Sequence, residues 1–364
     1  MRKILAYFLA SRLLFLLFAL LAPLFTPLRE GYLGTQFDRA APYLAWVWAN
    51  FDGRHFLSIA TEGYQRTNFA YFPLYPAAIW LLGRISIIPP LYLGILISGF
   101  LFLASMFVLH KIIRLDYKDN TASLALFFLC LFPLSFFYHS VYADSLFLLL
   151  STSSFYFARK GNWPASGILG ALTVLTRLSG VALIPALILE WYLQNKKLKA
   201  RGFIAPFLTL LGLVIYMVYL KLNFGDPLLF QKSMSAWQQS SFVFPPQVIW
   251  RYLKIFFFVD KNLLVFWIAV LEFASLFAYL ALSVYVWKKI RASYGAFMVA
   301  LLLLISFTGT FAGTPRYLLH LFPAYTGMAL LMHKNRPLLI ITVTVFLLFG
   351  FILTALFTRG YFVA

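Results

Sequence analysis

The chain has 364 residues, of which 62% are hydrophobic, 20% are aromatic and only 11% are charged, with a formal net charge of +19. A soluble domain carries about a quarter of its residues as charged side chains, so this composition excludes a soluble domain and indicates a polytopic, all-α membrane protein. Membrane topology and contacts with membrane lipid explain the excess of Lys and Arg, and we expect no nucleic-acid partner.

Apolar runs, many of them about the length that spans a hydrocarbon core, recur along the chain. The first run follows Arg2 and Lys3 and has no signal-peptidase site, so we expect it to be a retained helix. We expect about 11 spans in total, at residues 4–25, 91–109, 121–138, 142–158, 164–176, 180–193, 203–220, 263–287, 295–312, 317–332 and 337–357.

Short basic loops separate several of these runs, and such loops usually face the cytoplasm. The segment FAYFPLYPAAIWLLG (69–83) decides the number of spans, because a further crossing there would move every later basic loop outside. Pro73 and Pro76 break the start of this segment. We therefore expect it to be re-entrant or interfacial, with a full crossing as the alternative.

Two long loops, at about residues 26–90 and 221–262, are then exoplasmic, and residues 1–364 form one membrane domain. Aromatic-rich loops of modest charge commonly lie along the lipid headgroups, so we expect interfacial helices in the first loop. The tryptophans of the two loops are Trp46, Trp48, Trp80, Trp237 and Trp250.

The first notable acid is Asp52, in the stretch NFDGRHFLSIATEGY (50–64). Phe56, Ile59 and Ala60 follow it at helix-like spacing, which predicts a helix lying on the membrane with this face in lipid. Asp52 is then either the cap of that helix or a general base held just above the bilayer.

Three further ionisable residues lie in or beside apolar runs, where a charge is costly unless it is paired or functional. Asp144 lies at the start of a span, where its charge either interacts favourably with the helix macrodipole or binds a sugar hydroxyl. Arg177 separates two short apolar halves, which predicts a turn around residues 178–180 within the membrane. The guanidinium of Arg177 then binds either a phosphate or an acid such as Asp144. Arg316 begins a span, where it either snorkels to the headgroups or contacts a phosphate.

These stretches also match a known pattern in order. NFDGRHFLSIATEGY followed by FAYFPLYP resembles the motif pair that opens the PIG-V family of mannosyltransferases, and GTPRYLLHLFPAY resembles its proline–arginine–tyrosine segment. VYADSLF resembles the family's tyrosine–serine–glutamate–serine segment, with Asp144 in place of glutamate, and TRLSG resembles its arginine–serine–asparagine–glycine turn, with Leu178–Ser179 as the departure. FGDPLLFQKSMSAW (224–237) is similar to an exoplasmic loop of bacterial members, which favours a bacterial cytoplasmic membrane.

The resemblance implies a GT-C glycosyltransferase, a transmembrane helix bundle that works on the exoplasmic face. Such enzymes move a sugar, here most simply mannose, from a polyprenyl-phosphate donor to a lipid-linked or glycan acceptor, with inversion at the sugar. Asp52 is the expected base, and Arg177, Arg316 and Lys232 are expected to hold the donor phosphate. The expected sugar and acceptor contacts are His55, Tyr64, Tyr71, Asp144 and Tyr317.

No metal or other cofactor is expected, because the acids nearest to Asp52 in sequence, Asp38 and Glu62, form no tight cluster and no Cys–His zinc spacing occurs. One alternative function is a transporter or flippase of polyprenyl-linked sugars, and Glu272, in the middle of the run 263–287, favours it. The simpler interpretation of Glu272 is a buried acid bonded within the bundle. A non-catalytic scaffold is the third possibility.

Overall fold

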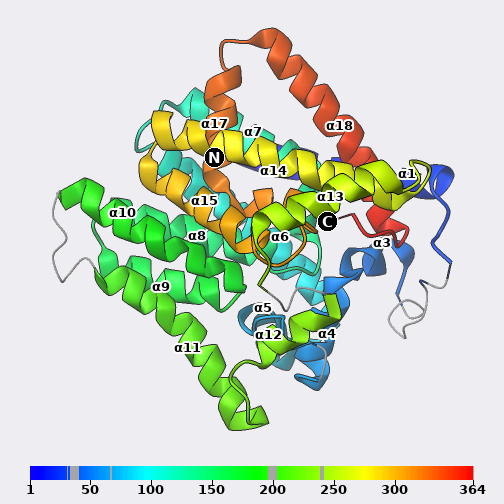
Figure 1. The fold of residues 1–364 in the computed structure, drawn as a ribbon, viewed down its shortest axis with the longest axis horizontal. Helices are drawn as coiled ribbons and strands as arrows, with labels where there is room; N and C mark the ends of the chain where they lie inside the picture. Colours follow the sequence, from blue (N-terminus) through cyan, green and yellow to red (C-terminus); the bar gives the residue numbers. More distant parts are fainter. Residues whose placement is uncertain (31, 33–40, 66–67, 196–202, 238–241, 364) are drawn as a thin grey trace. The chain divides into compact units, whose positions relative to one another are not determined.

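The structure is a computed structural model that describes residues 1–30, 32, 41–65, 68–195, 203–237 and 242–363. All secondary structure in these residues is helical, which confirms the predicted all-α class (Figure 1). Within these described ranges, five helices are long and apolar enough to cross a membrane. They are α1 (Arg2–Phe25), α6 (Pro90–Ile113), α11 (Ile204–Phe224), α14 (Leu264–Lys289) and α18 (Arg336–Thr358).

The other predicted runs, and the segment 69–83, contain shorter helices. A crossing of about 30 Å needs about 20 helical residues, and each of these helices is shorter than that. The number of spans and the path of residues 69–83 therefore stay predictions. These helices are α5 (Leu74–Ile85), α7 (Asp119–Leu131), α8 (Asp144–Arg159), α9 (Trp163–Val174), α10 (Leu183–Asn195), α15 (Ala292–Ser306) and α17 (Phe322–Met332).

The chain folds into two compact units. Unit 1 consists of Met1–Tyr64, Pro73–Thr152 and Met328–Val363, and unit 2 contains Gln65–Phe72 and Ser153–Gly327. Helices α8 and α17 each contain residues of both units. The expectation of a single membrane domain remains a prediction.

Within unit 1, α1 packs along α18 and α7. Arg12, in the middle of α1, donates to the carbonyl oxygen of Ser135 at 2.8 Å, to its Oγ at 2.7 Å and to the Nδ1 of His139 at 3.0 Å. Its guanidinium also lies 4.8 Å from the ring centroid of Phe102. A cation within an apolar helix needs such partners, so Arg12 fixes α1 to the 3₁₀ helix Ser135–His139 that leads into α8.

Within unit 2, α9 and α11 lie side by side because glycines line their interface (Figure 1). A Cβ on Gly167 would lie 2.8 Å from the Cα of Ala205, and a Cβ on Gly212 would overlap the backbone of Ala171. Small residues permit this close approach of helix backbones, which is a common means of association in membrane proteins.

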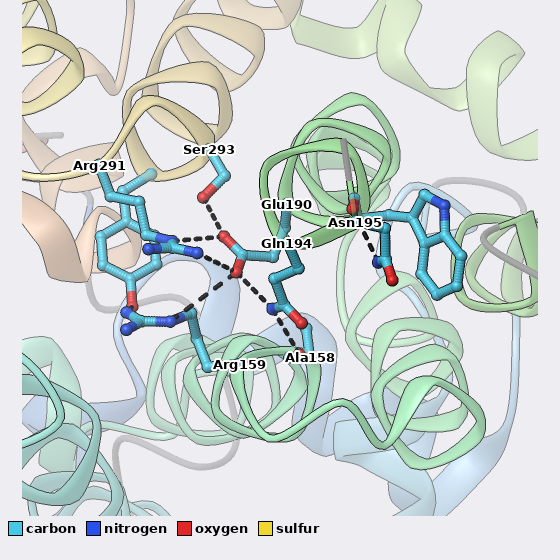
Figure 2. Close-up of polar contacts among 9 residues, drawn as sticks. Ala158, Arg159, Glu190, Gln194, Asn195, Arg291 and Ser293 are labelled. Atoms are coloured by element: carbon cyan, nitrogen blue, oxygen red, sulfur yellow. Dashed lines mark hydrogen bonds and ion pairs between the residues drawn. The ribbon is translucent and has the colours of Figure 1, made fainter. Parts of the chain in front are cut away.

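A buried carboxylate on α10 holds three elements of unit 2 together (Figure 2). Glu190, with no exposed surface, accepts from the Nε and Nη2 of Arg291 at 2.6 Å each and from the Oγ of Ser293 at 2.6 Å. Gln194 donates to it at 2.7 Å, and the Nε of Arg159 lies 3.8 Å away. Since Arg291 and Ser293 lie at the start of α15 and Arg159 ends α8, the cluster joins α8, α10 and α15.

The tryptophans of the two long loops do not share one environment. Trp80 and Trp250 are exposed, as expected for headgroup contacts, whereas Trp46 and Trp48 are buried inside the protein, so the headgroup prediction is wrong for these two. The side chain of Trp237 and the whole of Asp38 lie outside the described residues.

We expect Glu190→Gln to lower the free energy of unfolding by about 3 kcal/mol, because it leaves two partly buried arginines facing each other without a counter-charge. Thermal unfolding of the detergent-solubilised protein measures this loss. The matched control is Asp119→Asn, which breaks the exposed pair with His110 and should change the unfolding temperature little. Equal unfolding temperatures for the two variants would contradict the role given to Glu190.

Candidate active site

The predicted base lies directly after a strained residue. Helix α4 (Asp52–Glu62) begins at Asp52, and the N-cap position belongs to Phe51, with φ of 54° and ψ of −114°. Among the described residues, Phe51 is the only non-glycine residue with positive φ. Such a conformation costs on the order of 1–3 kcal/mol and persists only where the surroundings enforce it. Because the N-cap residue is Phe51 and Asp52 is the first helical residue, the interpretation of Asp52 as the cap of this helix is wrong.

Several contacts within unit 1 enforce this conformation. The ring of Phe51 lies 5.5 Å from that of Tyr32, 5.8 Å from that of Phe357 and 5.9 Å from that of Phe362. The preceding Asn50 is fully buried, and its Nδ2 donates to the carbonyl oxygen of Phe357 at 2.8 Å. The backbone that delivers Asp52 is thus held by residues near the carboxyl end of the chain.

A second set of bonds joins this backbone to the segment that carries Asp144. The Oη of Tyr142 donates to the carbonyl oxygen of Asn50 at 2.6 Å, and the backbone N–H of Val141 donates to the carbonyl oxygen of Trp48 at 2.8 Å. Asp144 lies two residues after Tyr142, fully buried at the start of α8, where the helix macrodipole favours a negative charge. The structure therefore brings together the two segments that carry Asp52 and Asp144.

The apolar face of α4 packs inside the protein and not against lipid, contrary to the prediction. Phe56, Ile59 and Ala60 are all buried, and the ring of Phe56 lies 5.1 Å from that of Tyr75 on α5 and 6.4 Å from that of Tyr142. Apolar spacing alone does not distinguish lipid from protein as the partner. This packing gives α4 a fixed orientation, which is useful for a helix that presents a reacting group.

His55 lies one turn after Asp52 on α4. Burial lowers the pKa of His55 below 6.5, the neighbouring Asp52 opposes this shift, and Arg54 adds to it. The guanidinium of Arg54 is itself held 4.6 Å from the ring centroid of Tyr32. His55 is therefore a neutral imidazole at neutral pH and can both donate and accept a hydrogen bond.

The depressed pKa of His55 predicts the direction of a pH effect on stability. As the pH falls through 6.5, the unfolded chain takes up a proton at His55 more readily than the folded chain, so the free energy of unfolding decreases. We expect His55→Asn to lose less stability than the unchanged protein between pH 7 and pH 5, as measured by thermal unfolding at both values. Parallel losses in the two proteins would contradict this assignment.

In unit 2, Arg177 lies at the predicted break. Helix α9 ends at Val174 and a 3₁₀ helix runs from Leu178 to Ala182, which confirms a turn at this point. The turn is tight, since a Cβ on Gly180 would lie 2.7 Å from the backbone nitrogen of Val174. The half-buried guanidinium of Arg177 lies 5.4 Å from the ring centroid of Tyr317.

Tyr317 connects this turn to the second arginine. Arg316 is buried in the short helix α16 (Thr314–Tyr317), next to Tyr317 in the chain. The structure therefore brings the segments of Arg177 and Arg316 together, with an aromatic ring beside them.

Glu272 on α14 accepts from the backbone N–H of Gly313, just before α16, and from the Oη of Tyr252. The interpretation of Glu272 as a buried acid bonded within the bundle is confirmed.

The remaining predicted site residues are Lys232, Tyr64 and Tyr71. Lys232, on α12 (Leu229–Ser233), is exposed and pairs with Asp226. Tyr64 is half-buried just after α4, and Tyr71 is half-buried in a short turn of unit 2. Its neighbour Phe72 packs on Tyr216, with the ring centroids 4.6 Å apart.

No group of three or more His, Cys, Asp or Glu side chains in the described ranges is arranged to hold a metal ion. Glu62 is exposed at the end of α4 and accepts from the Oγ of Ser58. The absence of a metal or other cofactor remains a prediction.

A model of one protein family matches the amino-terminal part of the chain. The family is described as mannosyltransferase (PIG-V), and the match runs over residues 1–219, more than half of the chain. The chain belongs to the PIG-V mannosyltransferase family. The matched residues include Asp52, Asp144 and Arg177, while Arg316 lies beyond them.

Two curated relatives from rodents support this family assignment. The chain is 29% identical over 174 residues to GPI alpha-1,6-mannosyltransferase 2 of Rattus norvegicus and 31% identical over 144 residues to that of Cricetulus griseus. These matches cover 44% and 36% of this chain. They span about a third of the relatives, namely 35% and 29% of their lengths.

The fold of the PIG-V chain is similar to that of ArnT from Cupriavidus metallidurans, whose crystal structure was solved with undecaprenyl phosphate bound. The TM-score is 0.54 at 15% identity, and the match covers 94% of this chain and 62% of ArnT. At this identity the likeness concerns the fold alone. It confirms the GT-C-type bundle expected from the sequence, and with the five apolar helices it identifies an integral membrane protein.

Proposed function

We propose that this PIG-V family protein is an inverting glycosyltransferase that moves a mannose from a polyprenyl-phosphate donor to a hydroxyl of a lipid-linked or glycan acceptor. The observation that carries the proposal is the family match over residues 1–219, which takes in Asp52 and Arg177. The donor class is supported by the fold likeness to ArnT, which was solved with undecaprenyl phosphate.

The first requirement of the reaction is a base for the acceptor hydroxyl. A hydroxyl is a weak nucleophile until a positioned carboxylate takes its proton. We assign this step to Asp52, whose position is fixed by the strained Phe51 before it and by the packed face of α4 behind it. His55, a neutral imidazole one turn later, orients the acceptor hydroxyl by hydrogen bonding.

The second requirement is a partner for the leaving group. The acceptor oxygen forms a bond to the anomeric carbon as the bond from that carbon to the phosphate oxygen breaks, and the electron pair goes to the phosphate. Donors aimed at this developing charge lower the barrier. We assign them to Arg177 and Arg316, because guanidinium groups match the geometry of phosphate oxygens. Lys232, paired with Asp226, is an exposed additional cation.

The remaining assignments concern the sugar and acceptor. Asp144 is proposed to bind sugar hydroxyls, and Tyr64, Tyr71 and Tyr317 to contact the sugar or the acceptor. No metal or other cofactor takes part in the proposed reaction. The active site is proposed to face the exoplasmic side of a bacterial cytoplasmic membrane, since the basic loops favour an inside location for the opposite ends of the helices.

We expect Asp52→Asn to lower kcat by roughly 10²–10⁴-fold while donor binding is retained, because only proton transfer is lost. Purified protein, a polyprenyl-phosphate mannose and an acceptor provide the assay. Glu62→Gln, which removes an acid from the other end of α4, is the matched control and should keep full activity. Full activity of Asp52→Asn would reject the base assignment.

We expect Arg177→Ala to raise the donor KM by roughly 10–100-fold, since a charge-assisted contact to phosphate is lost. Arg177→Lys should recover only part of the affinity, because an ammonium group lacks the planar fork. Arg84→Ala is the control, since Arg84 also lies over an aromatic ring, 5.3 Å from the centroid of Trp80. Donor affinity that is unchanged in Arg177→Ala would refute the phosphate contact.

A further inference from the structure

The carboxylate of Glu272 is buried in α14, one of the helices apolar enough to span a membrane. Burying an ionisable side chain in such a helix costs free energy, so such residues are usually paired with other groups or functional. Its Oε2 accepts from the Oη of Tyr252 at 2.6 Å, and its Oε1 accepts from the backbone N–H of Gly313 at 3.3 Å. One carboxylate oxygen therefore bonds the residue just before α16, and the other bonds Tyr252 on the neighbouring helix α13.

Tyr252 lies on α13 (Pro245–Phe258) and binds the same segment a second time. The backbone N–H of Phe311 donates to its Oη at 3.1 Å, and the Oγ1 of Thr310 lies 3.3 Å from it. The ring of Tyr252 also lies 4.9 Å from that of Phe311. One hydroxyl thus links Glu272 to the backbone of residues 310–311.

Further contacts from α13 and the residues before it extend this attachment. The Nη1 of Arg251 donates to the carbonyl oxygen of Gly309 at 2.9 Å, and the N–H of Val243 donates to the carbonyl oxygen of Phe307 at 3.0 Å. Gly309 and Gly313 have φ of 91° and 80°. The segment 307–313 is therefore an irregular turn whose shape depends on bonds from outside itself.

This turn ends three residues before Arg316, with only the first residues of α16 between them. The Oη of Tyr279 on α14 donates to the carbonyl oxygen of Pro315 at 2.9 Å, so α14 also holds the backbone next to the arginine. A buried guanidinium that must meet phosphate oxygens within a fraction of an ångström needs this kind of support.

We propose that Tyr252 and Glu272 are positioning residues, which set the backbone of 309–313 and thereby the place of the Arg316 guanidinium. This inference rests on the proposed function, in which Arg316 contacts the donor phosphate. It gives α13 a specific task, namely to hold the turn before α16 from one side while α14 holds it from the other. It also explains Glu272 without a transport pathway.

The test uses the full chain and measures kcat and KM for donor and acceptor separately. We expect Tyr252→Phe, which removes the shared hydroxyl and keeps the ring, to raise the donor KM roughly tenfold and to leave the acceptor KM unchanged. Glu272→Gln, which keeps one acceptor oxygen of the two, should give a smaller rise. Tyr294→Phe is the matched control, because it removes another buried tyrosine hydroxyl, one that accepts from Arg159, and it should leave the donor KM unchanged.

A double-mutant comparison separates positioning from general damage. If Tyr252 acts through Arg316, the double variant Tyr252→Phe/Arg316→Gln should have the donor KM of Arg316→Gln alone, to within about twofold. Independent, multiplied effects would overturn the positioning role, as would an unchanged donor KM in both Tyr252→Phe and Glu272→Gln. If Arg316→Gln itself leaves the donor KM unchanged, the phosphate contact fails, and this inference fails with it. If Arg316→Gln raises the donor KM and neither Tyr252→Phe nor Glu272→Gln does, the inference fails alone.

Discussion

The energetic cost of an unpaired polar group within an apolar bundle is the constraint on which this structure depends. Arg12 is bonded to a serine and a histidine, Glu190 to two arginines and Glu272 to a tyrosine and a backbone N–H. Each of these residues ties together segments far apart in the sequence. The few charges that the apolar helices contain therefore determine how the irregular segments between helices are held.

Those irregular segments carry the residues proposed for the reaction. Asp52 follows a residue with positive φ, Arg177 follows a broken helix and Arg316 follows a turn with two glycines at positive φ. A regular helix presents side chains only at fixed intervals along its surface, whereas these breaks orient the side chains independently. The proposed transferase thus combines rigid apolar helices with a small number of short, externally supported turns.

The sequence predicted the all-helical class because long apolar runs have one common solution in lipid. It also predicted the break at Arg177, since each flanking half was too short for a full span. It did not predict the helix α13, which lies in a stretch assigned to a loop. It did not predict the cluster around Glu190, because that acid lies within an apolar run and its partners Arg159 and Arg291 were assigned to basic loops for topology alone. The packed face of α4 was misassigned to lipid for a related reason, namely that apolar spacing does not identify what covers it.

The dependence of Phe51 on Phe357 and Phe362 has a consequence for substitutions far from Asp52 in the sequence. These rings come from the last residues that the structure describes, yet they stabilise the backbone turn in front of the proposed catalytic carboxylate. A change of Phe357 or Phe362 would therefore loosen the conformation of the residue beside Asp52, although some 300 positions of sequence separate them.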